Sequence, residues 1–310
     1  MNGTEKARKL QDNINRVLIG KKEVVRDVVT CFLADGHILL EDVPGVGKTT
    51  LATALSASMD CSFGRIQFTP DTLPTDVTGT AVYQMQLQEF VYQPGVVMNH
   101  IILADEINRT SPKTQSGLLE AMEEKQVTVD GKIYPLPEPF LVIATQNPIE
   151  YLGTYPLPEA QLDRFMMKLS IGYPSPAEEI RMGQRFVAGE AQKKLHPVLT
   201  TDDILSMREE LKSVAVSDKV LSYTEDIISA TRNDEGFSLG ASPRAMLHLL
   251  SAARAAAYLD DRDYVVPDDI KSAAEKVLPH RLVLSSEARI RKESPKALLH
   301  ALIGRIRVPV

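Results

Sequence analysis

A short segment that combines two glycines, one lysine and two threonines carries the clearest chemical signal in the chain. It lies between an apolar run, His37–Leu40, and a stretch with helical character, Thr50–Ser58. Glycines let a backbone approach phosphate oxygens closely, and the N–H groups at a helix N-terminus bind anions. The segment therefore predicts a phosphate-binding loop. Its residues are Val43, Pro44, Gly45, Val46, Gly47, Lys48, Thr49 and Thr50.

Two of these residues have distinct roles in such a loop. Lys48 is expected to reach the β- and γ-phosphates, and the Thr49 hydroxyl is expected to bind Mg²⁺. The loop departs from the strict spacing at one position, because Asp42 stands where a glycine is usual. The remaining Pro-Gly-x-Gly-Lys-Thr core is intact, and it arises by chance in roughly one chain in a few thousand of this length. The alternative interpretation is a basic turn before an ordinary helix.

A second signal is the apolar run Ile101–Ala104, which ends in Asp105 and Glu106. A strand that ends in two acids places both carboxylates at the carboxyl edge of a sheet, where open α/β folds bind ligands. Asp105 is expected to hold Mg²⁺, and Glu106 is expected to act as the base for an attacking water. A solvated strand end explains such a pair equally well on its own. Behind a phosphate loop, the tandem acids favour ATP hydrolysis that drives mechanical work.

The elements that position these residues are predicted from periodicity. Apolar runs bounded by turn residues and separated by helical stretches indicate βαβ units and a buried parallel sheet. Two further segments break this rhythm and are predicted as inserted hairpins, the second with an Asp130-Gly131 pair that favours a type I′ turn. The chain is expected to begin with two helices, Glu5–Leu18 and Lys21–Ala34. The predicted strands are His37–Leu40, Phe63–Phe68, Ile101–Ala104 and Phe140–Thr145. The predicted hairpins are Thr78–Pro94 and Gln126–Pro135.

The pattern changes after residue 176, and the rest of the chain is expected to be helical. Proline in the first turn marks several of the helix starts. We therefore predict two domains, an α/β domain over residues 1–190 and a small all-helical domain over 191–310. The expected helices are Ala177–Val187, Asp202–Leu211, Asp218–Thr231, Ser242–Leu259, Pro267–Leu278 and Pro295–Ile306.

Five sequence motifs, given below in chain order, resemble those of the AAA+ ATPases, and specifically those of the MoxR family within the helix-2-insert clade. The resemblance spans nearly the whole chain, and Asp42 is part of this family's version of the phosphate loop. It implies a P-loop NTPase αβα sandwich with a parallel sheet and inserted hairpins, followed by a helical lid. The motifs are Glu41–Thr49 (Walker A), Asp105–Arg109 (Walker B), Ala144–Pro148 (sensor 1), Leu157–Phe165 (arginine finger) and Gly240–Arg244 (sensor 2).

The resemblance also assigns roles to single residues. Asn147 is expected to lie beside Glu106 and to contact the water and the γ-phosphate. Arg164 is expected to reach the nucleotide site of a neighbouring subunit, where a guanidinium stays charged and bridges phosphate oxygens; the alternative is a surface salt bridge with Asp163 or Glu159. Arg244 is expected to contact phosphates from the lid, in its own subunit or in a neighbour's.

Two assignments are less specific. Ile19 and Gly20, between the first two helices, are expected to line the adenine, and the alternative is a plain helix–helix turn. Arg109 joins the subunit interface or pairs with Glu123 or Glu124.

The resemblance implies an ATP-driven oligomeric remodeller that uses ATP and Mg²⁺. We expect a homo-oligomer, a hexameric ring by family resemblance, with chaperone-like work on a client protein and a partner that bears a von Willebrand factor A domain. Two alternatives remain, a nucleic-acid motor and a nucleotide-bound scaffold with little turnover. An intact Glu106 argues against the scaffold.

Composition narrows these classes further. The chain has 310 residues, with 35 Lys+Arg against 41 Asp+Glu and a formal net charge of −6. This balance disfavours a protein that coats nucleic acid. The two cysteines, Cys31 and Cys61, are too few for a disulfide framework and fit a reducing compartment. No signal peptide or membrane-spanning run is recognised, so we expect a cytoplasmic protein.

Overall fold

A five-stranded parallel sheet organises the N-terminal part of the computed structural model, which describes residues 2–147, 153–188 and 195–309. The strand order is β2-β5-β8-β1-β9, so both strands next to β1 follow it in the chain only after the other sheet strands β2 and β5. Four strands confirm the predicted apolar runs. The sequence does not predict the fifth, β9, because three residues are too few to show a period. The strands are β1 Ile38–Glu41, β2 Phe63–Gln67, β5 Ile101–Asp105, β8 Leu141–Gln146 and β9 Met167–Leu169.

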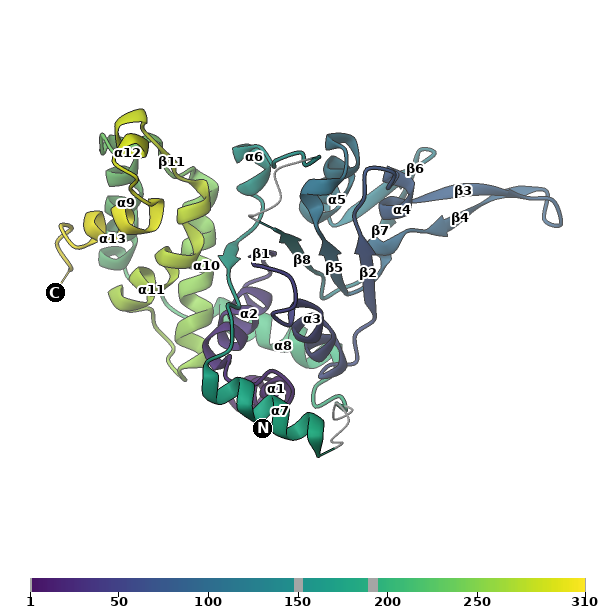
Figure 1. Ribbon diagram of the computed structural model, residues 1–310, viewed down its shortest axis with the longest axis horizontal. Helices are drawn as coiled ribbons and strands as arrows, with labels where there is room; N and C mark the ends of the chain where they lie inside the picture. The colour runs from purple at the N-terminus through teal and green to yellow at the C-terminus, as the bar shows by residue number, and fades with distance from the viewer. Residues whose placement is uncertain (1, 148–152, 189–194, 310) are drawn as a thin grey trace.

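Alternate residues of each central strand pack into two different hydrophobic clusters, one on each face of the sheet. Ile38 and Leu40 of β1 pack with the N-terminal helices, whereas Leu39 packs on the opposite face with α5 (Pro112–Glu124). This burial on both faces explains why the strands read as continuous apolar runs. Helices cover the first face, as Figure 1 shows; they are α1 Gly3–Asn15, α2 Lys22–Leu33 and α3 Lys48–Ala57.

Both predicted hairpins are present. The first, β3 (Gly79–Gln84) and β4 (Glu89–Pro94), follows the short helix α4 (Pro74–Thr78) and projects away from the body in Figure 1. The second is β6 (Gln126–Val129) and β7 (Lys132–Pro135). Its turn residues both have positive φ, 49° and 75°, as a type I′ turn requires.

The rings of Tyr92 on β4 and Tyr134 on β7 stack with centroids 4.0 Å apart, and this contact joins the bases of the two hairpins.

The C-terminal part is helical, as predicted. Its helices from residue 218 onward form a separate group beside the sheet in Figure 1, whereas the two helices before them lie with the N-terminal helices. It also contains a small antiparallel sheet of β10 (Phe237–Leu239) and β11 (Val283–Leu284), which the sequence does not predict because both strands are very short. The expected domain boundary at residues 190 and 191 lies outside the described residues. The helices are α7 Pro176–Val187, α8 Thr201–Lys212, α9 Asp218–Asn233, α10 Pro243–Leu259, α11 Pro267–Val277, α12 Ser286–Ile290 and α13 Pro295–Ile303.

One hydrophobic cluster runs from the N-terminal helices into this C-terminal group. It includes Val28 of α2 and Leu249 and Ala253 of α10, all fully buried. Because the two parts share a core, α10 is held firmly against the α/β part. Within the described residues, no helix combines the length and the apolar character that a membrane crossing needs.

Candidate nucleotide-binding site

The phosphate loop connects β1 to α3 and adopts a conformation that only glycine tolerates well. Gly45 and Gly47 have φ of 85° and 97°. A Cβ atom on Gly45 would meet nothing within 4 Å, because the loop faces open space. Gly47 is the N-cap of α3 and offers no side chain to the first turn of the helix. The N–H groups of that turn therefore point toward the loop's open side, where they can bind an anion.

A cavity of about 350 Å³ opens in front of this loop at the carboxyl ends of β2, β5 and β8. It brings the phosphate loop together with both predicted acids and with Asn147, which come from separate parts of the chain. This volume and lining fit a phosphate chain with a bound Mg²⁺, because backbone donors, a lysine, a hydroxyl and a carboxylate all face it. The lining residues are Pro44, Gly45, Gly47, Lys48, Thr49, Thr50, Arg65, Gln67, Asp105, Glu106, Thr145 and Asn147.

Lys48 lies at the start of α3 with its ammonium group turned back along the loop. Its Nζ donates to the carbonyl oxygen of Asp42 at 2.8 Å. Burial lowers the pKa of Lys48, and the carboxylates of Asp42, Asp105 and Glu106 counter that effect. The ammonium therefore sits between the loop and the acids, where an oxyanion would replace its backbone partner.

The two predicted acids share a partner on β8. Thr145 Oγ1 donates to Asp105 Oδ1 at 3.3 Å and accepts from the backbone N–H of Glu106 at 2.9 Å. Glu106 has φ of 56°, a left-handed conformation that costs energy in a residue with a side chain. The hydrogen bond from its N–H to Thr145 stabilises this turn, which aims the Glu106 carboxylate into the cavity.

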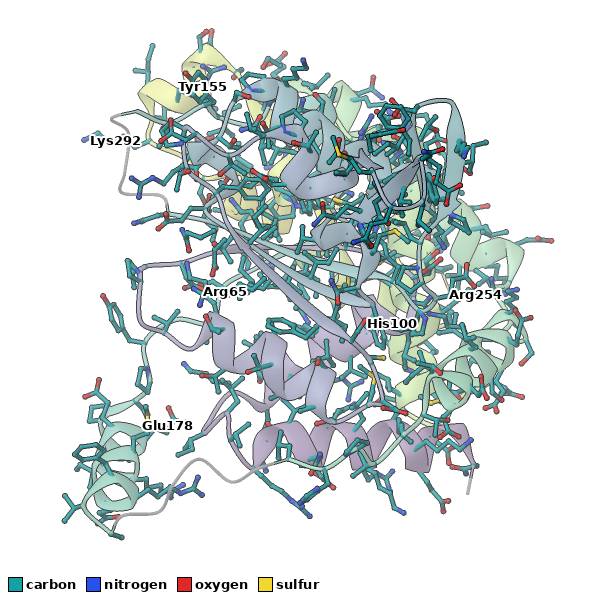
Figure 2. The ribbon with its side chains drawn as sticks, turned by 90° about the vertical axis from the view of Figure 1, so that its right-hand side faces the viewer. Arg65, His100, Tyr155, Glu178, Arg254 and Lys292 are labelled. Atoms are coloured by element: carbon teal, nitrogen blue, oxygen red, sulfur yellow. The ribbon has the colours of Figure 1, made fainter. Side chains whose placement is uncertain are left out.

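Sequence reasoning missed two side chains of β2 that contact these acids. Arg65 Nε and Nη2 both lie 2.9 Å from Asp105 Oδ2, and Figure 2 shows Arg65 beside the loop that precedes α3. Gln67 Nε2 donates to Glu106 Oε2 at 2.7 Å. A signal was present: residues 65 and 67 are polar at a spacing of two in an otherwise apolar run, so they share one face of the strand.

Arg109 also contacts Glu106. Its Nη1 donates to Glu106 Oε2 at 3.1 Å. Within the described residues, Arg109 forms an ion pair with Glu106, and Glu123 pairs with two other arginines. The expected role of Arg109 at a subunit interface stays a prediction.

Asp42, the residue that breaks the strict loop spacing, has a structural task. Its buried carboxylate accepts from Ser170 Oγ at 2.7 Å and from the backbone N–H groups of Ile171 and Gly172 at 2.5 and 3.1 Å. These residues follow β9, the edge strand beside β1. Asp42 thus fastens the phosphate loop to the segment that leads toward α7.

Replacement of Asp42 by asparagine is expected to lower the free energy of unfolding by about 1.5–3 kcal/mol, because the loss affects hydrogen bonds to a charged acceptor. Urea denaturation followed by circular dichroism measures the change. The exposed Asp71→Asn variant is the control. Equal stability of the two variants would contradict the role of Asp42 as an anchor.

Several predicted nucleotide residues do not line the cavity, and the structure leaves their roles untested. Ile19 is half-buried and Gly20 exposed, and a Cβ on Gly20 would collide with the Glu178 carboxylate of α7. Figure 2 places Glu178 on α7 at the edge of the molecule. Leu18 lies next to the loop, since its Cδ1 is 3.4 Å from the position of a Cβ on Gly47. The segment before α2 is therefore adjacent to the phosphate loop, as an adenine-lining role requires. Val43 and Val46 belong to the loop itself.

The two predicted phosphate-binding arginines lie elsewhere. The lining of the nucleotide cavity, taken over the described residues, includes neither Arg164 nor Arg244. Both line a second cavity of about 190 Å³ and pair with one carboxylate, Glu123 of α5. In the part of the chain that the structure describes, the ion pair of Arg164 is thus with Glu123 and not with the expected alternatives Asp163 or Glu159, and Asp163 pairs with Arg281.

Comparisons with known proteins agree with this geometry. Residues 37–167 match the family described as "ATPase family associated with various cellular activities (AAA)", and residues 229–302 match the AAA lid domain. The chain is 41% identical to Chaperone MoxR1 of Mycobacterium tuberculosis over 305 residues, which cover 96% of this chain and 80% of that protein. The chain belongs to the MoxR family of AAA+ ATPases.

Two further matches extend the likeness over nearly the whole chain. The chain is 49% identical to the uncharacterised protein YeaC of Bacillus subtilis, over 97% of this chain and 94% of that one. The crystal structure of a Cytophaga hutchinsonii protein, described as a candidate ATPase, superposes with a TM-score of 0.92 at 39% identity and covers 99% of this chain and 96% of that chain. The AAA match runs from just before β1 into β9, and the lid match runs from α9 to α13.

Proposed function

We propose that this MoxR-family protein hydrolyses ATP in a ring of identical subunits and uses the energy to remodel client proteins. One observation carries the proposal. Lys48, Asp105 and Glu106 line one cavity, whereas Arg164 and Arg244 line a different one. A single chain thus lacks the two cations that the family resemblance assigns to its phosphates, and a neighbouring copy can supply them.

The residues of the cavity divide the chemical work. Lys48 and the first N–H groups of α3 hold the β- and γ-phosphates. Thr49 and Asp105 would hold Mg²⁺, which neutralises phosphate charge when bound. Glu106 takes a proton from the attacking water, and Asn147 orients that water. Because Gln67 and Arg109 both contact Glu106 Oε2, they fix the carboxylate and leave Oε1 as the oxygen that accepts the proton.

Arg164 and Arg244 complete the site from the neighbouring subunit. A guanidinium suits this task because it stays charged and donates to several phosphate oxygens at once. The two arginines share one partner, Glu123, so their guanidinium groups lie together at one place on the surface. This supports the proposal that both act on the same nucleotide of a neighbouring subunit. A hexameric ring is the assembly that the family resemblance favours.

The hairpin β3–β4 is the proposed contact with client proteins. Met85, Leu87 and Phe90 near its tip are 58–85% exposed. Glu89 is the only charged residue among residues 79–94, so the hairpin offers apolar surface and no phosphate-binding cations. This composition favours a protein client over nucleic acid. A relative is named Chaperone MoxR1, which fits such work. A partner with a von Willebrand factor A domain and a cytoplasmic location stay predictions from the sequence.

The Lys48→Ala variant tests the nucleotide site. We expect its affinity for a fluorescent ADP analogue to fall by about 10- to 100-fold, since one charge-assisted hydrogen bond to phosphate is lost. Titration of the purified chain measures the affinity, and Lys113→Ala, an exposed position on α5, is the control. Unchanged affinity in Lys48→Ala would refute the loop as the phosphate site.

A further inference from the structure

Side chains from two separate segments converge on the carboxylate of Glu123 in α5. Arg164, which follows the short helix α6 (Glu159–Leu162), places Nη2 3.0 Å from Glu123 Oε2. Arg244, in the first turn of α10, places Nη2 on the other oxygen, Oε1. The side chains of the three residues are 30–39% exposed. One acid thus holds two guanidinium groups side by side at the surface, each by a single nitrogen.

A buried arginine fixes the backbone behind this pair. Arg281 of the turn η3 (Pro279–Arg281) has a side chain only 2% exposed, and its Nε donates to Asp163 Oδ1 at 2.7 Å. The Asp163 carboxylate also accepts from Ser242 Oγ, the N-cap of α10, at 3.0–3.1 Å. Asp163 precedes Arg164, and Ser242 lies two residues before Arg244. Both arginines therefore start from anchored backbone, and only their side chains need a further partner.

We propose that Glu123 is a positioning residue for phosphoryl transfer: it holds Arg164 and Arg244 together so that both face one nucleotide of the neighbouring subunit. This inference rests on the proposed function. Two guanidinium groups bound to one carboxylate repel each other, and long arginine side chains lose much rotational freedom when they are held in one orientation. The carboxylate offsets both effects. A guanidinium has five N–H donors, so one bond to Glu123 leaves donors for phosphate oxygens. Exposed ion pairs add little to stability, so folding alone does not explain the arrangement.

The Glu123→Gln variant tests this role. The amide keeps the size of the side chain but removes the charge and one of the two acceptor oxygens. We expect the ATPase rate per assembled chain to fall by about 10- to 100-fold, as for a reacting group displaced by up to about 1 Å. The affinity of the isolated chain for fluorescent ADP and its thermal midpoint stay unchanged. Glu124→Gln, the next and also exposed residue of α5, is the matched control.

Mixing separates this role from one in the chain's own site. The Lys48→Ala variant keeps an intact arginine pair, so its addition to Glu123→Gln is expected to restore part of the rate. The inference is overturned if the ATPase rate of Glu123→Gln equals that of Glu124→Gln or exceeds the native rate. A drop in the ADP affinity or in the thermal midpoint of Glu123→Gln would also overturn it. So would a failure of Lys48→Ala to restore activity in assemblies that are proven to contain both variants. If instead the proposed function were wrong, the result would differ, because Arg164→Ala itself would keep the full ATPase rate of the assembled protein.

Discussion

The Arg164→Ala variant is expected to lower the ATPase rate of the assembled protein by about 10³–10⁵-fold, the range found for arginine fingers in other phosphoryl-transfer enzymes. The reason is that negative charge on the transferred phosphate loses its guanidinium partner in the transition state. Binding of ADP to the isolated chain is expected to stay the same, since Arg164 does not line that chain's own nucleotide cavity.

The measurement is the steady-state rate of phosphate release at a protein concentration that gives full assembly. Arg289→Ala, an exposed arginine of the lid, controls for loss of surface charge. A rate within threefold of the control, with assembly intact, would contradict the assignment of Arg164 as the finger.

The Glu106→Gln variant is expected to lower kcat by about 10²–10⁴-fold, the contribution typical of a positioned general base. The amide keeps an oxygen that can accept from Gln67 and Arg109, so the geometry of the site is preserved. It cannot take the proton of the attacking water. Because the phosphate loop is unchanged, the variant still binds ATP and holds it uncleaved.

Rapid separation of the protein–nucleotide complex, followed by analysis of the ATP and ADP that it retains, measures this trapping. Glu120→Gln on the exposed side of α5 is the control. Near-normal turnover by Glu106→Gln would remove Glu106 as the base.

Local pattern is enough to predict most elements of the fold. Because β1, β5 and β8 are buried on both sheet faces, they stand in the sequence as apolar runs, and the glycines of the loop mark backbone that few other residues adopt. The short strands β9, β10 and β11 have no such signal. Their pairing depends on neighbours that the tertiary fold supplies.

The residues of the site also divide into those that the sequence predicts and those that it does not. Lys48, Asp105 and Glu106 stand in local motifs, so residue type and spacing are enough to indicate their chemistry. Arg65 does not, because its contact with Asp105 joins two strands whose neighbouring position emerges only in the folded sheet. The structural role of Asp42 is not predictable from local sequence either, because its hydrogen-bond partners lie in the segment after β9.

The contact of Arg164 and Arg244 with Glu123 is the part of the structure that the sequence predicts least. Glu123, Arg164 and Arg244 are far apart in sequence, and exposed charges have no period that would reveal a shared partner. The family resemblance identifies both arginines but not the acid between them.

The most direct test of a site completed across a subunit boundary is the ATPase rate of mixed assemblies of Lys48→Ala and Arg164→Ala chains. Each variant alone is expected to be inactive. In a ring with head-to-tail contacts, random equimolar mixing pairs an intact nucleotide loop with an intact donated arginine at about a quarter of the sites, so about a quarter of the native rate should return. An inactive mixture, with co-assembly proven, would show that Arg164 does not act on a neighbour's nucleotide.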